Sequence, residues 1–119
     1  LNQIPFSSTT RFQNVDSKMG TNPEELIAAA HAGCFSMALS FQLSGAGFVP
    51  TELKTTATIL LRQKESGFEI AEIQLNLEGK VPGVTEEKFQ ELAQVAKKNC
   101  PVSKALAAVP ISLTARLVQ

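Results

Sequence analysis

The sequence predicts an α+β domain, in which a long apolar helix is followed by two strands, two shorter helices and a last strand. Three observations support this fold class. Residues 26–51 contain no Asp, Glu, Lys or Arg, residues 51–79 alternate apolar with polar side chains, and residues 85–99 repeat apolar side chains with a helical period. No repeat or linker interrupts the 119 residues, so we expect a single domain over residues 1–119.

The first helix has a strong start signal. A short strand is expected at residues 7–12 and a loop follows it. Asn22 can then cap the helix, Pro23 suits its first position, and Glu25 can complete a capping-box-like arrangement. We expect a helix over residues 23–44, roughly 30 Å long, that ends at Gly45 and Gly47.

The uncharged stretch around this helix raises a second possibility, a transmembrane helix, because it is longer than about 18 residues. Its serines, glycines and single histidine, and the mean hydropathy of only +0.05 for the whole chain, argue against that. The sequence therefore favours the buried central helix of a soluble fold, with no membrane partner. Nothing at the start of the chain resembles a signal peptide, and we expect a cytoplasmic protein.

The next segment changes from a helical period to a period of two. Residues 51–63 predict a strand with one buried face, whose members are Leu53, Thr55, Ala57, Ile59 and Leu61. After a turn at residues 64–67, residues 68–79 predict a second strand. Its apolar residues change from even to odd positions along the strand, and a bulge near Ala71 would reconcile the two phases.

The last third of the chain predicts two helices and a strand. Thr85 followed by two glutamates begins a helix whose buried stripe is Phe89, Leu92, Ala93 and Ala96. Cys100 and Pro101 interrupt it, and a short helix is expected over residues 101–108. Residues 111–117 alternate apolar with polar side chains and predict the final strand.

Composition excludes several classes of protein. Eleven Lys and Arg balance eleven Asp and Glu without a basic cluster, which argues against a nucleic-acid partner. Two cysteines are too few for a secreted disulfide scaffold, and one histidine with two cysteines cannot fill a four-ligand zinc site without carboxylates. The remaining class is an intracellular-type domain with two thiols.

Cys34 lies in the middle of the first helix among alanines and a glycine. It can be a small buried hydrophobic residue, or a reactive thiol if a neighbouring cation lowers its pKa. His31 stands three residues earlier on a shared face, which admits a metal-ligand or general-base role. A hydrogen-bonded histidine in the core or at an interface is the alternative.

Cys100 directly precedes Pro101, so its sulfur is expected at the positive end of the short helix, where a thiolate is stabilised. A loop cysteine without chemical consequence is the alternative. The two thiols could also form one disulfide, either structural or redox-active.

Glu24 and Arg11 are the charged candidates. Glu24 precedes Cys34 by ten residues on one helix, about 15 Å along the axis, so the two side chains cannot touch. Arg11 could pair with Glu24 and favour a thiolate nearby. Glu24 could instead be a partner of the helix dipole.

Four motifs together carry a resemblance that covers nearly the whole chain. They are GTNPEEL at residues 20–26, AAHA at 29–32, CFSMAL at 34–39 and NCPVSKAL at 99–106. With these motifs the chain resembles the OsmC/Ohr family of peroxidases, and the Arg11-Phe12 pair and the surroundings of His31 look more like the OsmC branch. The resemblance implies an OsmC-like fold of antiparallel sheets packed around a long central helix, in an intertwined homodimer with sites at the subunit interface. Family members have strands before the point that corresponds to Leu1, so we expect this domain to lack N-terminal strands.

The same resemblance implies a thiol-dependent peroxidase that reduces organic hydroperoxides, and also hydrogen peroxide, without metal, haem, flavin or another cofactor. Cys34 matches the peroxidatic cysteine, Cys100 the resolving cysteine, Arg11 the catalytic arginine and Glu24 the glutamate that positions it. A dithiol or a lipoylated protein is the implied reductant. Apolar candidates for a substrate slot are Phe12, Phe35, Met37 and Phe89.

Two other functions stay open at this point. One is a domain of the same fold that binds small apolar ligands or a protein partner with weak catalysis. The other is a domain in which Cys34 and Cys100 form a purely structural disulfide.

Overall fold

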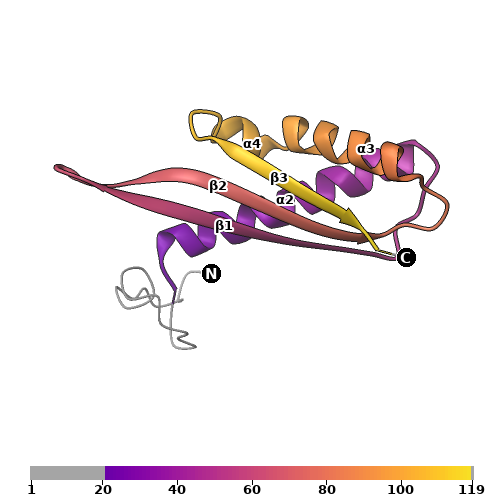
Figure 1. The fold of residues 1–119 in the computed structure, drawn as a ribbon, viewed down its shortest axis with the longest axis horizontal. Helices are drawn as coiled ribbons and strands as arrows, with labels where there is room; N and C mark the ends of the chain where they lie inside the picture. The colour runs from indigo at the N-terminus through magenta and orange to yellow at the C-terminus, as the bar shows by residue number, and fades with distance from the viewer. Residues whose placement is uncertain (1–20, 119) are drawn as a thin grey trace.

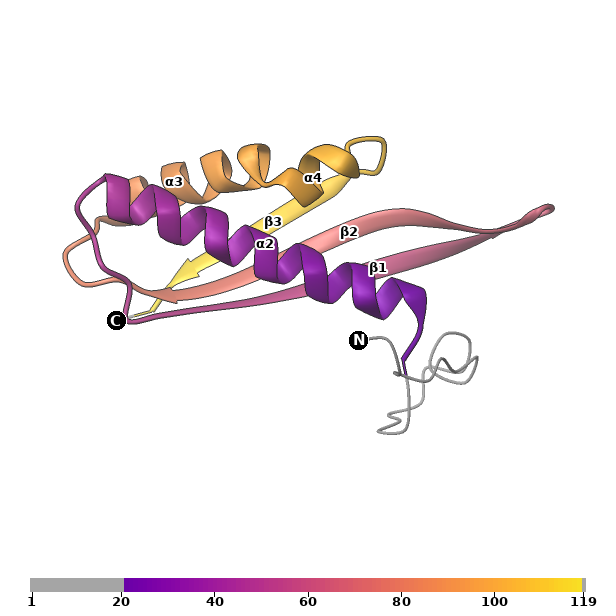
Figure 2. The ribbon, with the colours of Figure 1, turned by 180° about the vertical axis from the view of Figure 1, so that it is seen from behind.

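The structure, a computed structural model, describes residues 21–118. Its elements in chain order are α2 (Pro23–Gly45), β1 (Glu52–Lys64), β2 (Gly67–Lys80), α3 (Glu86–Asn99), α4 (Pro101–Ala105) and β3 (Ile111–Leu117). The strands form one layer, and the helices cover one face of it (Figure 1; Figure 2 from behind). The α+β fold class is thereby confirmed, whereas the strand expected at residues 7–12 lies outside the described residues.

The three strands form one mixed sheet in the order β1-β2-β3. β1 and β2 are an antiparallel hairpin, as their short connection requires. β3 runs parallel to β2, so this described sheet is not antiparallel throughout. The reason is the connection between them, because α3 and α4 carry the chain back along the sheet before β3 begins.

A bulge interrupts the long hairpin where the sequence predicts one. Leu60 pairs with Glu72 but Leu61 pairs with Ile70, which leaves Ala71 without a cross-strand partner. This extra residue changes the phase of β2 and keeps its apolar residues on the helix-covered face on both sides of the bulge.

Side-chain and backbone caps fix the two ends of α2. The Asn22 side chain accepts a hydrogen bond from the Glu25 amide at 2.9 Å, and the Glu25 carboxylate accepts one from the Thr21 hydroxyl. At the other end the helix stops at Gly45, and Gly47 adopts a φ of +91°, which suits glycine. The predicted bounds of this helix are therefore confirmed to within one residue.

The core lies between α2, α3 and the sheet. Thr85 caps α3 through a hydrogen bond from the Lys88 amide at 3.1 Å. The buried side chains of α3 are the predicted stripe, Phe89, Leu92, Ala93 and Ala96. They pack with residues of α2 and β2, among them Phe35, Leu39, Leu43, Leu75 and Leu77. α4 is shorter than predicted, because turns replace the helix after Ala105.

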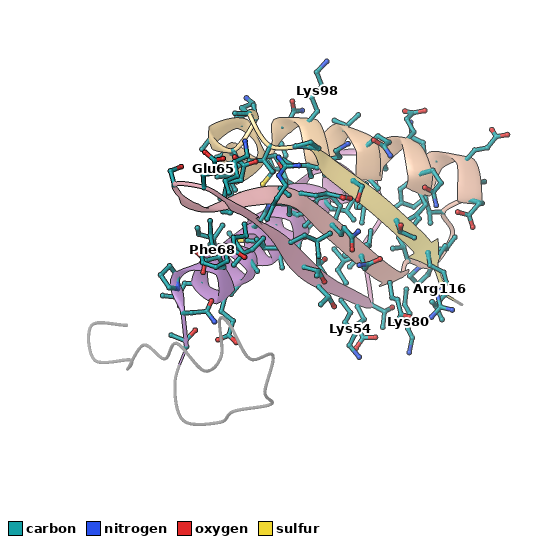
Figure 3. The ribbon with its side chains drawn as sticks, turned by 60° about the vertical axis from the view of Figure 1, so that its left-hand side comes forward. Lys54, Glu65, Phe68, Lys80, Lys98 and Arg116 are labelled. Carbon is teal, nitrogen blue, oxygen red and sulfur yellow. The ribbon has the colours of Figure 1, made fainter. Side chains whose placement is uncertain are left out.

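Within this chain α2 buries a single row of side chains, which comprises His31, Phe35, Leu39 and Leu43. Met37 and Phe41 on another face are each 76% exposed, so the expected burial on nearly every side is not reached within one copy. By length and composition alone α2 could cross a membrane, a test that core helices of soluble proteins also pass. The open face of the sheet is polar, and Figure 3 shows Lys54, Lys80 and Arg116 projecting from it, away from the helices.

Candidate active site

The fold brings together the two cysteines, which are far apart in the sequence. The Sγ atoms of Cys34 and Cys100 lie 2.9 Å apart, within hydrogen-bonding distance, and both residues are free thiols. A disulfide has an S–S bond of about 2.05 Å, so an approach of about 0.9 Å would join the two sulfurs. The arrangement can therefore form and break a disulfide without rearranging the fold.

Helical backbone holds both cysteines in place. Cys34 lies in the middle of α2, whereas Cys100 is the joint between α3 and α4. The Cys100 amide donates to the Ala96 carbonyl at 2.9 Å, and the Cys100 carbonyl accepts from the Lys104 amide at 3.0 Å. Pro101 begins α4, as predicted, and directs the chain into this second helix.

The surroundings shift the pKa values of the two thiols in opposite directions. Burial and the hydrogen bond to Cys100 raise the pKa of the Cys34 thiol, with a smaller opposing effect from the Val102 amide. Burial also disfavours the Cys100 thiolate, but hydrogen bonds from the Cys34 thiol and from the amide and hydroxyl of Ser103 outweigh it and lower the pKa of Cys100. Among the described residues, no cation contributes to the pKa of either thiol. The described surroundings therefore favour a thiolate on Cys100 over one on Cys34.

The two cysteines also differ in their exposure to solvent, and the one with the raised pKa is the more exposed. Cys100 is fully buried at 0% exposure, whereas Cys34 is partly exposed. A small molecule that arrives from solvent therefore meets Cys34 before Cys100.

A buried polar pair lies beside the cysteines. The Nε2 atom of His31 is 2.7 Å from the Oγ atom of Ser103, and His31 is fully buried. The structure thus confirms the hydrogen-bonded histidine in the core. Ser103 was not among the sequence-based candidates. A signal for it is the shared spacing, since Ser103 follows Cys100 by three residues just as Cys34 follows His31 by three.

The charged candidates are not brought to the sulfurs within the described residues. Glu24 lies in the first turn of α2, about 15 Å along the helix axis from Cys34. Arg11 lies outside the described residues.

Two of the apolar slot candidates occupy a different place from the one expected. Phe35 and Phe89 are fully buried in the hydrophobic core, so they cannot line an opening to solvent. Their apolar character reflects the packing of α2 on α3. Met37 is exposed, and Phe12 lies outside the described residues.

No group of three or more His, Cys, Asp or Glu side chains within residues 21–118 is arranged to hold a metal ion. The reactive groups that the described residues bring together at this site are the thiols of Cys34 and Cys100.

The chain is similar in sequence and in fold to several known proteins. The family model described as OsmC-like protein matches residues 15–114. The chain is 51% identical over 108 residues to Peroxiredoxin OsmC of Escherichia coli strain K12, a match that covers 91% of this chain and 73% of that protein. Two solved structures are also similar. The crystal structure of the organic hydroperoxide resistance protein OhrB of Bacillus subtilis has a TM-score of 0.64 and 31% identity, over 85% of this chain and 73% of that one. The OsmC-like protein of Mycoplasma pneumoniae has a TM-score of 0.76 over 91% of this chain and 77% of that one, and at 19% identity it shows the shared fold.

Proposed function

The chain belongs to the OsmC/Ohr family, and from this premise we propose that it is a cysteine-based peroxidase that reduces organic hydroperoxides, and also hydrogen peroxide. The observation that carries the proposal is the 2.9 Å separation of the Cys34 and Cys100 sulfurs in a chain of this family. Relatives named as a peroxiredoxin and as organic hydroperoxide resistance proteins support the substrate class.

We assign the attack on peroxide to Cys34, because a substrate can reach this partly exposed sulfur and cannot reach buried Cys100. The Cys34 thiolate attacks one peroxide oxygen, an S–O bond forms, the O–O bond breaks, and the alkoxide leaves and takes a proton to become an alcohol. Cys34 is then a sulfenic acid. The peroxide has gained the two electrons that the sulfur has lost.

Cys100 completes the first half of the cycle. Its thiolate attacks the Cys34 sulfur, an S–S bond forms, and the hydroxyl group leaves as water after it takes a proton. An external dithiol, or a lipoylated protein, then attacks the disulfide through a mixed disulfide and returns both cysteines to thiols while it is itself oxidised. This cycle needs a reducing compartment, which supports a cytoplasmic location.

Arg11 and Glu24 are proposed in the roles that the family resemblance implies. The described surroundings raise the pKa of Cys34, so the attacking thiolate needs a cation that the described residues do not supply. The Arg11 guanidinium would stabilise this thiolate and the charge that develops on the peroxide, and Glu24 would hold Arg11. Replacing Arg11 with Met should then slow the peroxide step far more than replacing it with Lys. Equal rates in the two variants would contradict this role.

We further propose that two copies pair as a homodimer. Met37 and Phe41 lie one helical turn apart on α2 and are each 76% exposed, a pattern that favours burial against another subunit. The family resemblance implies the same assembly, with the site at the interface. A second subunit would also give α2 the burial that it lacks within one copy.

Free-thiol counting tests the proposed function. One equivalent of cumene hydroperoxide should remove two thiols per chain within one turnover, and a dithiol should restore them. Cys34→Ser should consume no peroxide, whereas Cys100→Ser should stop at a sulfenic acid that dimedone traps. If Cys34→Ser keeps the rate of the unmodified chain, the assignment is wrong. If the thiols of the unmodified chain survive peroxide, the chain is instead a weakly catalytic ligand-binding domain.

A further inference from the structure

His31 is a buried titratable side chain that the peroxidase cycle does not use. It lies on α2 at 0% exposure, and its Nε2 atom is 2.7 Å from the Ser103 hydroxyl oxygen on α4. Its Nδ1 atom is buried without a hydrogen-bond partner among residues 21–118. A fully enclosed ring that is tied to one neighbour through one nitrogen has a defined protonation state.

The protonation state of His31 follows from the surroundings of its two ring nitrogens. Burial lowers the pKa of His31, so the ring is neutral and carries one N–H. A proton on Nδ1 would be a buried donor without an acceptor, which is costly, whereas a bare nitrogen there costs less. The proton therefore lies on Nε2, and His31 donates a hydrogen bond to the Ser103 oxygen.

The direction of this hydrogen bond decides what Ser103 does. A serine hydroxyl has one proton, and the Ser103 oxygen already accepts from His31. Its own proton is free to point to the sulfur of Cys100, which lies three residues earlier at the N-cap of α4 and whose pKa the Ser103 side chain lowers. Among the described residues, three other groups lower the pKa of Cys100: the amides of Val102 and Ser103 on α4 and the thiol of Cys34 on α2. The hydrogen bond from His31 thus leaves the Ser103 hydroxyl free to donate toward Cys100.

We propose that His31 is a positioning residue, which fixes the Ser103 hydroxyl as a donor to the Cys100 thiolate and thereby speeds the steps in which Cys100 carries negative charge. The proposal rests on the proposed function. One such step is the attack of Cys100 on the Cys34 sulfenic acid, in which the S–S bond forms and water leaves. The other is the reduction of the disulfide, in which a dithiol thiolate bonds to Cys34 and Cys100 departs with the electron pair of the broken S–S bond. His31 takes no part in the attack on peroxide.

The direct test is the acidity of Cys100 in the full chain carrying Cys34→Ser, which retains a hydroxyl beside Cys100. The ultraviolet absorbance of the thiolate is followed against pH. Ser103→Ala should weaken the acid dissociation of Cys100 about tenfold, since one hydrogen bond to a charged group is lost. His31→Leu should weaken it about threefold, and His31→Gln, whose amide can donate from the same place, should restore it.

A matched control is Ser36→Ala, which removes a hydroxyl from α2, the helix that carries His31. The Oγ atom of Ser36 lies 2.6 Å from the Oγ1 atom of Thr55 on β1. It should leave the acidity of Cys100 unchanged. If Ser103→Ala leaves it unchanged as well, the proposal is overturned. Equal titrations of His31→Gln and His31→Leu would assign His31 to packing and also overturn it. Should His31→Leu fail to fold, His31→Met takes its place, because its side chain also lacks an N–H donor.

Kinetics provides the second readout in the chain with both cysteines. Ser103→Ala and His31→Leu should slow disulfide formation and let dimedone trap more sulfenic acid, and His31→Gln should restore the rate. An unchanged rate of disulfide formation in both variants would contradict the proposal. Absence of peroxide consumption by the unmodified chain would instead contradict the proposed function, and the Cys100 titration would still decide the role of His31.

Discussion

Gly79 on β2 is the position at which the structure predicts the effect of a single methyl group. A Cβ atom at this glycine would lie 2.8 Å from Cε1 and 2.9 Å from Cζ of Phe89, and 3.3 Å from Cδ2 of Leu53. Carbon atoms in contact are normally about 3.5–4.0 Å apart, so the methyl group would overlap the ring by about 0.7 Å or more. Phe89 is fully buried at the start of α3 and has little room to move.

Two opposing effects set the magnitude for Gly79→Ala. Alanine in a strand avoids the entropy cost of glycine and stabilises the folded state by about 0.5–1 kcal/mol. Overpacking of a core costs about 1–3 kcal/mol, and we expect it to prevail because the obstacle is a buried ring. The free energy of unfolding should therefore fall by about 1–2 kcal/mol.

A double-mutant cycle isolates this contact. In urea unfolding at one fixed protein concentration, Gly79→Ala should destabilise the natural chain but should be neutral or slightly stabilising with Phe89→Leu, which removes the ring. If Gly79→Ala costs the same with and without the Phe89 ring, the steric reasoning is refuted.

Three further predictions concern stability and assembly. Burial lowers the pKa of His31 in the folded state below the ordinary histidine value of 6.5. The stability that neutral His31 contributes is therefore complete above pH 6.5 and is lost as the pH falls from 6.5 through the folded-state pKa. His31→Gln should reduce this loss in unfolding experiments. Phe41→Lys should weaken self-association at least tenfold in sedimentation equilibrium, because each copy loses the burial of an exposed phenylalanine. Asn22→Ala should lower the free energy of urea unfolding by about 1 kcal/mol, since it removes the cap of the Glu25 amide.

Each of these predictions has an outcome that contradicts it. An equal acid dependence for the natural chain and His31→Gln would mean that His31 does not titrate with folding. An unchanged sedimentation profile for Phe41→Lys would remove this face of α2 from the interface. The control is Lys98→Glu at an exposed position of α3, which should also leave the profile unchanged. Stability of Asn22→Ala equal to that of the natural chain would show that the N-terminus of α2 frays without cost.

Local signals in the sequence predicted most of the described fold. Asn22, Pro23 and Thr85 marked where the two long helices begin, because capping depends on residues within one turn. The change of phase along residues 68–79 predicted the bulge at Ala71 for a similar reason, since side chains alternate with a fixed period.

Long-range contacts explain what the sequence did not predict. The parallel direction of β3 depends on where α3 and α4 return the chain, which no local pattern encodes. Phe35 and Phe89 were assigned to a substrate slot because an aromatic residue has the same appearance in a core and beside a ligand.

The same distinction applies to the candidate site. The cysteines could be paired from their motifs, but their relative acidity depends on which groups donate to each sulfur. Ser103 lowers the pKa of Cys100 and contacts His31 on another helix. A contact between two helices is not encoded in a local sequence pattern, so the structure was needed to identify Ser103.

Ala71 is, finally, a residue that the hairpin could lose. If it were deleted, Ile70 would still face Leu61 and Glu72 would still face Leu60, so every cross-strand partner and both faces of the sheet would be preserved. Its contribution is therefore to shape, since an extra residue on one strand bends and twists the ribbon toward its tip, where the hairpin extends beyond the helices in Figures 1 and 2. A shortened protein without Ala71 should keep its fold and its thiols while its hairpin tip points in a new direction.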